Sequence, residues 1–159
     1  MALIIAILPE EVKGVGICSR VYTQNDSYID YNTPTLMLEK LYKQKGKSKK
    51  EMDKKFTKLT QIKRNIPYTI DSNQVFFPFK FRQTNYDKQS RGFVNITFVR
   101  EIKDNYIILK TGEMIATLNK QASLIQNKNN AMIMLLREIL KIQQEENNAI
   151  RFLNGNIIS

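Results

Sequence analysis

Apolar and polar residues alternate with a period of two in several short segments of this chain, and turn-forming residues separate these segments. Such alternation is typical of β-strands that pair antiparallel and bury one face. The short polar turns between them predict two or three β-hairpins. Pro67 and Pro78 indicate edge or bulged positions in one hairpin, because proline has no N–H to donate. We expect strands over residues 3–8, 16–23, 28–31, 66–70, 75–79, 93–100, 106–109 and 114–118.

Two helix starts are marked in the first half of the chain. Thr33 and Pro34 predict an N-cap followed by proline at the first helical position. Ser48 and Glu51 have the spacing of a capping box, in which the serine oxygen accepts from the backbone of the third helical residue. A second helix is therefore predicted over about residues 49–62.

A third helix is predicted over residues 130–144, and its apolar residues cover more than half of the circumference. A helix of this kind must pack on two sides. Its second side contacts either the sheet of its own domain or a second copy of the chain, and both alternatives stay open. If a second copy covers it, the expected interface residues are Met132, Leu135, Leu136 and Ile139.

Strands and helices together predict an α+β fold in one domain. The expected domain spans residues 1–146 and has an antiparallel sheet, a basic helix in the first half and an apolar C-terminal helix. Residues 147–159 are expected to form a C-terminal tail.

The positive charge of the chain is concentrated in one segment. The chain has 25 Lys and Arg residues against 15 Asp and Glu residues, and a formal net charge of +10. Residues 40–64 hold eleven basic and two acidic residues, a net charge of +9. An AT-rich coding sequence explains abundant lysine but not its clustering, so the segment indicates a binding surface.

The second predicted helix separates lysine from apolar residues. Lys50, Lys54 and Lys58 fall on one side, and Met52, Phe56 and Leu59 fall on the other. Lysines four residues apart repel each other, and a phosphate backbone would reverse this cost. The alternative is an ordinary solvated face. The expected phosphate contacts are Lys47, Lys49, Lys50, Lys54, Lys55, Lys58, Lys63 and Arg64.

The composition excludes several kinds of enzyme. The chain has no histidine and a single cysteine, Cys18, which excludes a Ser-His-Asp triad, a Cys-His pair and an imidazole zinc site. The acidic pairs Glu10 with Glu11 and Asp26 with Asp30 lack the spacing of metal ligands. We therefore expect a protein that is not an enzyme and that uses no cofactor and no metal.

The apolar start of the chain, residues 1–8, lacks a basic flank and is too short to span a bilayer. It is therefore interpreted as an interior strand. We expect a cytoplasmic protein without membrane contact, and an unpaired cysteine fits a reducing compartment.

Four stretches share their order and spacing with one known family. They read Ile4-Ile-Ala-Ile-Leu-Pro-Glu-Glu11, Ile17-Cys-Ser-Arg20, Ile66-Pro-Tyr-Thr-Ile-Asp-Ser-Asn-Gln-Val-Phe-Phe-Pro78 and Thr111-Gly-Glu113. The chain resembles the ComK family of bacterial competence transcription factors over about residues 3–142. The third stretch is the most specific part of the resemblance.

The resemblance implies a cytoplasmic activator of DNA-uptake genes that recognises paired AT-rich boxes in double-stranded DNA as a homodimer or a pair of dimers. It further implies contacts with the transcription or proteolysis machinery. From the residues alone, two alternatives stay open for the basic segment. It could bind an acidic protein, as a regulator or antagonist, or it could bind RNA.

The long polar connection over residues 80–92 supplies candidates for reading DNA. AT-rich duplexes have a narrow minor groove whose negative potential attracts inserted arginine. Tyr86, Phe79 and Phe81 are either wedges between base steps or core residues, and the core is the more common place for an aromatic residue beside a strand. The basic residues of this connection, which could instead be merely solvated, are Arg82, Lys88 and Arg91.

Overall fold

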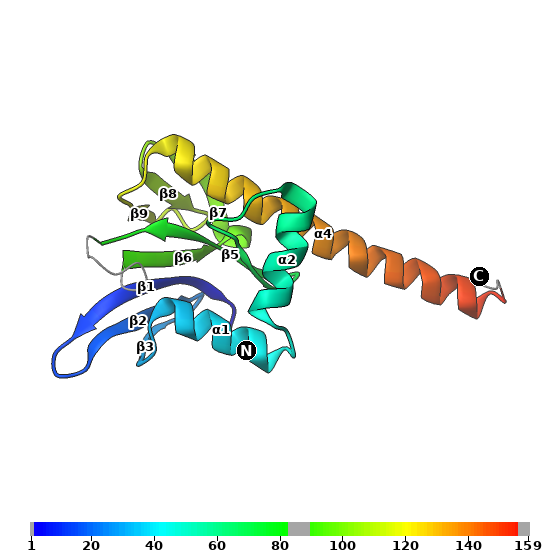
Figure 1. Ribbon diagram of the computed structural model, residues 1–159, viewed down its shortest axis with the longest axis horizontal. Coiled ribbons are helices and arrows are strands. Elements are labelled where there is room, and N and C mark those ends of the chain that lie inside the picture. Colours follow the sequence, from blue (N-terminus) through cyan, green and yellow to red (C-terminus); the bar gives the residue numbers. More distant parts are fainter. Residues whose placement is uncertain (1, 83–89, 156–159) are drawn as a thin grey trace.

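The structure, a computed structural model, describes residues 2–82 and 90–155 (Figure 1). The helices are α1 (Pro34–Gln44), α2 (Lys49–Thr60) and α4 (Gln121–Leu153), with a short 3-10 helix η1 (Ile96–Phe98). The strands are β1 (Ile4–Val12), β2 (Gly16–Thr23), β3 (Ser27–Asp30), β4 (Tyr68–Asp71), β5 (Gln74–Lys80), β6 (Arg91–Asn95), β7 (Val99–Lys103), β8 (Tyr106–Leu109) and β9 (Met114–Ala116).

The strands form two antiparallel sheets, which confirms the α+β prediction. One sheet has six strands in the order β3-β2-β1-β6-β5-β4, and the other has three in the order β7-β8-β9. Both sheets are built from sequential antiparallel pairs, apart from the contact of β1 with β6 that joins the two halves of the larger sheet. Alternation predicts eight strands, but it reveals neither the break between β6 and β7 nor the division into two sheets.

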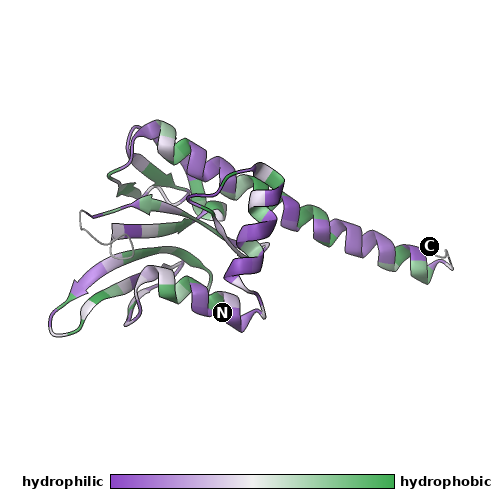
Figure 2. Cartoon of the chain, in the orientation of Figure 1, coloured by the Kyte–Doolittle hydropathy of each residue, from purple (hydrophilic) through white to green (hydrophobic). Residues whose placement is uncertain are grey.

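The six-stranded sheet separates two apolar cores. On one face, Leu38 and Tyr42 of α1 pack with Phe93 of β6. On the other face, Val94 of β6 packs with Ile107 of the small sheet and with α4. Because neighbouring residues of a strand point to opposite faces, β6 contributes to both cores at once. Figure 2 shows the hydrophobic residues concentrated in these central strands.

The two predicted helix starts have different physical causes. Ser48 Oγ accepts from Glu51 N at 3.4 Å, as the capping box predicts. Thr33 makes no such bond, although α1 does begin at Pro34. Thr33 is the N-cap residue in position, as predicted, but its side chain does not cap the helix. The fixed φ angle of Pro34, which is buried at the first helical position, favours the start of α1 there.

The strand predicted over residues 93–100 is interrupted at Asn95. The chain leaves β6 there, makes the single turn η1 and continues as β7. Asn95 is fully buried, and its Nδ2 donates to Ile4 O at 3.0 Å and to Asn73 O at 2.9 Å. Its Oδ1 accepts from Thr97 N at 3.2 Å and from Thr97 Oγ1 at 3.0 Å. This amide diverts the chain from one sheet to the other.

Neither proline of the predicted hairpin lies at a position where strand pairing needs a backbone N–H donor. Pro67 directly precedes β4, which is an edge strand. Pro78 lies within β5, but the pairing of β4 with β5 reaches only to Phe76, so the β4 side of Pro78 is open. Asn127 Nδ2 of α4 donates to the Pro78 carbonyl at 3.0 Å and fills that position.

Helix α4 is 33 residues long, more than twice the predicted 130–144, and it includes residues 147–153 of the expected tail. One side packs on the sheets through Leu124, Ala131 and Met134. Of the predicted interface residues, Leu135 packs partly against this core. The others are exposed, namely Met132, Leu136 and Ile139. None of the described helices is both long and apolar enough to cross a membrane.

We expect the substitution Asn95→Leu to lower the free energy of unfolding by about 3 kcal/mol or more. The apolar side chain leaves the buried Ile4 carbonyl, and the partly buried Asn73 carbonyl and Thr97 N, without this partner. A buried polar group left without a hydrogen bond costs about 1–3 kcal/mol. Urea unfolding followed by circular dichroism measures the change. The same substitution at Asn25, in an exposed turn, is the control. Equal stability of the two variants would contradict the role given to Asn95.

Candidate nucleic-acid interface

Helix α2 lies over the β4 edge of the six-stranded sheet (Figure 1). Met52 is buried in the core on the α1 face of the sheet, whereas Phe56 is buried in the core on the opposite face. These two side chains, four residues apart, hold α2 across the edge strand. Leu59 was predicted to share this apolar side, but it is 51% exposed.

The lysine ridge of α2 consists of Lys50, Lys54 and Lys58, and all three are exposed. At 1.5 Å per residue the ridge extends about 12 Å along the helix axis. Lys54 Nζ lies 3.9 Å from Glu51 Oε1, and both side chains are 65% exposed, so this pair contributes little to stability. Lys55 is exposed beside the ridge.

Two of the predicted phosphate contacts have partners within the fold. Lys47 Nζ donates to Ile70 O at 2.7 Å and to Thr69 O at 3.3 Å, on the edge strand β4. Lys49 Nζ pairs with a carboxylate oxygen of Asp53 and lies 5.7 Å from the centre of the Tyr68 ring. Both lysines therefore fix the start of α2 against the β4–β5 hairpin.

The turn after α2 presents two further cations. Gln61 has a φ angle of 66°, in the left-handed region, and ends the helix. Thr57 Oγ1 donates to Ile62 O at 2.8 Å, and the Ile62 side chain packs against the core. Because Ile62 is held inward, Lys63 and Arg64 follow on the surface and are exposed. The turn continues the positive surface of the lysine ridge.

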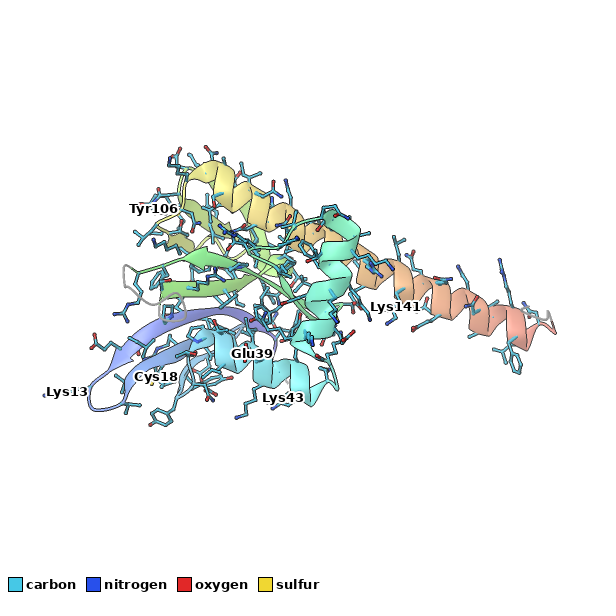
Figure 3. The ribbon with its side chains drawn as sticks, viewed as in Figure 1. Lys13, Cys18, Glu39, Lys43, Tyr106 and Lys141 are labelled. Atoms are coloured by element: carbon cyan, nitrogen blue, oxygen red, sulfur yellow. The ribbon has the colours of Figure 1, made fainter. Side chains whose placement is uncertain are left out.

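A cleft of about 820 Å³ opens between α1, α2 and strands β4 and β6. It brings Arg91 of β6 to the same hollow as Lys63 and Arg64, which the sequence separates by 27 residues or more. Glu39 of α1, labelled in Figure 3, also lines it. We call this hollow the basic cleft. Its ionisable side chains are Glu39, Lys49, Asp53, Lys63, Arg64, Tyr68 and Arg91.

Most cations of this surface are not neutralised by the protein. Within residues 2–82 and 90–155, the ion pairs closer than 4.0 Å involve only Lys49 and Lys54 among the predicted contacts. Counting partners among the described residues alone, the predicted contacts whose charge is left for an anionic ligand are Lys50, Lys55, Lys58, Lys63, Arg64, Arg82 and Arg91.

Two buried tyrosines lie between α1 and β4. Burial raises the pKa of Tyr42 and of Tyr68 above the ordinary value of 10.0. Tyr42 Oη accepts from Thr69 N at 2.7 Å, which opposes part of that rise. Both phenols are therefore neutral at physiological pH, and the Tyr68 wall of the basic cleft adds no negative charge.

Arg82 and Arg91 lie at the two ends of the connection between β5 and β6. Phe81 N and Arg82 N both donate to Ser90 O, at 2.8 and 3.2 Å, which holds these ends together. Phe79 is buried and its ring meets that of Phe81 edge-on at 6.2 Å, so both aromatic rings belong to the core. Lys88 and Tyr86 lie outside the described residues.

The acidic pairs considered as metal ligands have other roles. Glu10 forms an ion pair with Arg20 at 3.0 Å, and Asp30 Oδ1 accepts from Asn32 N at 2.9 Å. Asp26 Oδ1 accepts from Ser27 N at 2.7 Å. In the part of the chain that the structure describes, no group of three cysteine, aspartate or glutamate side chains is placed to hold a metal ion.

Comparison with models of known protein families, with curated proteins and with solved structures gave no match. The resemblance to the ComK family stays a prediction from the four stretches of sequence, and the function is argued below from the surface itself.

We expect Lys47→Met to lower the free energy of unfolding by about 1–3 kcal/mol, because the substitution removes a charged donor from two carbonyls of the edge strand. Lys50→Met removes the same charge from the exposed ridge and should change stability by less than about 0.5 kcal/mol. Thermal unfolding of both variants tests the difference. Two equal values would show that Lys47 does not anchor β4.

Proposed function

We propose that this protein is a DNA-binding transcription regulator of competence genes that prefers AT-rich duplex DNA and acts in the cytoplasm. The observation that carries the proposal is one positive surface of two parts. The lysine ridge of α2 forms one part, and the basic cleft with Lys63, Arg64 and Arg91 forms the other. The two parts form one continuous surface, because Lys63 lines both the basic cleft and the shallow hollow beside the lysine ridge.

The dimensions of the ridge suit the phosphates of a duplex. Each strand of double-stranded DNA carries one negative charge per about 3.4 Å of the axis, so the 12 Å of the ridge spans about three or four phosphates of one strand. Binding of lysine to phosphate releases condensed counterions, and this release provides most of the affinity. Contacts of this kind set the orientation of the protein on DNA without reading its sequence.

We assign the preference for AT-rich sequence to Arg82 and Arg91. The minor groove narrows in AT-rich tracts and its potential becomes more negative, which favours inserted guanidinium groups. Arg91 lies beside the phosphate-binding cations in the basic cleft, and Arg82 lies at the other end of the same connection. These positions support the assignment of both arginines to groove insertion, with the ridge holding the adjacent backbone.

The resemblance to the ComK family adds the biological assignment. It supports activation of DNA-uptake genes and binding to paired boxes as a homodimer or a pair of dimers. Neither catalysis nor a cofactor is part of this function, since the proposed surface works by charge and shape alone.

Replacing Lys50, Lys54 and Lys58 together with glutamate should weaken binding to an AT-rich duplex by about 100-fold or more at 0.1 M salt, because three phosphate contacts become repulsive. Fluorescence anisotropy of a labelled duplex measures this loss. The control is the triple variant Lys13→Glu, Lys103→Glu and Lys110→Glu, which changes net charge equally at exposed sites in the β1–β2 turn and the small sheet.

Equal weakening by the two triple variants would mean that net charge alone matters, and it would contradict a binding surface on α2. If the α2 variant loses RNA or an acidic protein but not DNA, one of the two alternative partners is correct and the proposal fails.

Binding of the unmodified protein should fall by about 10³-fold between 50 and 200 mM salt if at least six phosphates are neutralised. The logarithmic slope against salt should decrease by about three in the α2 triple variant, one for each lost phosphate contact. A flat salt response of the unmodified protein would rule out this mode of binding.

A further inference from the structure

Helix α4 has apolar side chains on two sides, and only one of them is used by the fold. Ala131 and Met134 face the sheets and are buried. At 3.6 residues per turn, Met132 and Leu136 lie on roughly the opposite side. A patch of exposed apolar side chains along one helix is typical of an interaction surface. It comprises Met132, Ile133, Leu136, Ile139, Leu140 and Ile142, which are 37–63% exposed.

The second half of α4 extends beyond both sheets, as Figure 1 shows, and Lys141 marks this part in Figure 3. No residue of α4 after Met134 is buried, yet the helix continues to Leu153. A helix of that length without tertiary contacts is only marginally stable in water. Figure 2 shows hydrophobic residues recurring along this projecting half. A partner that covers them would stabilise it.

Two charged residues border the apolar patch symmetrically. Lys128 and Glu146 are eighteen residues apart, which is five full turns, so they lie on the same side of α4. Both are nine residues from position 137, the middle of the patch. Between them lies a seam formed by Met132, Leu135, Ile139 and Ile142, and its spacings of three and four residues are those of a coiled coil.

A second copy of α4 can pack antiparallel to the first, with residue 137 of both copies at the centre. The seam residues of the two copies then meet in matching pairs. Met132 of one copy then faces Ile142 of the other, and Leu135 faces Ile139. At each end of the patch Lys128 of one copy faces Glu146 of the other. The symmetry repeats every contact twice, as an isologous interface requires.

The parallel arrangement lacks this complementarity. It places Lys128 against Lys128 and Glu146 against Glu146, and juxtaposed like charges in an interface cost several kcal/mol. It also brings the two globular parts to the same end of the helix pair. In the antiparallel arrangement the projecting half of each copy, around Ile150, lies beside the sheet-bound half of the other, around Ile125.

We propose that two copies of this chain associate through α4 in an antiparallel pair, with Lys128 and Glu146 fixing the register. This interface gives a structural basis to the homodimer of the proposed function, but its test needs no DNA. Loss of DNA binding by an intact dimer would contradict only the DNA proposal.

Sedimentation equilibrium without DNA should show a dimer of the unmodified protein. Lys128→Glu and Glu146→Lys should each weaken the dimer by about tenfold or more, since each creates two like-charge contacts. The double variant restores opposite charges and should regain the unmodified affinity within about threefold. Lys141→Glu, on the polar side of α4, is the matched control and should leave the dimer unchanged. Circular dichroism verifies that each variant keeps its helix content.

A monomer at all concentrations would overturn the proposal. So would a dimer that neither single charge variant weakens, which is the result expected for parallel helices or for another interface. Ile139→Glu, at a seam position that is 38% exposed in the single chain, provides a second test that is independent of register. It should abolish the dimer by burying a charge in the seam, and a dimer that persists in this variant would exclude α4 as the interface.

Discussion

The buried side-chain amide of Asn95 joins three parts of the chain at one point, and the rest of the fold depends on this junction. It holds the first strand through Ile4, the β4–β5 turn through Asn73 and the start of η1 through Thr97. Since all its hydrogen bonds are satisfied, the amide specifies one arrangement at little cost. The chain leaves the six-stranded sheet here and enters the small sheet, while β4 forms one edge of the six-stranded sheet.

The packing of α2 over β4 determines where the positive charge lies. Met52 and Phe56 enter the cores on opposite faces of the sheet, so the remaining side of α2 must face solvent. Lys47 and the Tyr42 hydroxyl form hydrogen bonds with backbone groups of the edge strand itself. The edge is thus protected from pairing with another sheet, and the lysine ridge stands on a rigid base beside the basic cleft.

Much of the fold follows from local sequence, because alternation, caps and turn residues act within a few positions. The strands β1, β2, β4 and β5 and the start of α2 at Ser48 were predictable on this basis. The break at Asn95 was not, since its cause is hydrogen bonding to residues far along the chain. Lys47 and Lys49 look like the other lysines in sequence, and only the packed hairpin distinguishes them. Sheet order likewise brings Arg91 to Lys63, which no spacing rule indicates.

The most direct measurement of the proposed function is the affinity of the unmodified protein for three ligands at 0.15 M salt: an AT-rich duplex, a GC-rich duplex of equal length and single-stranded RNA. Phosphate contacts alone give similar affinities for the two duplexes, whereas arginine in a narrow minor groove favours the AT-rich one. We expect tightest binding to the AT-rich duplex, by about tenfold or more over the GC-rich duplex. Equal binding to both duplexes, or tighter binding to RNA, would contradict a regulator that recognises AT-rich DNA.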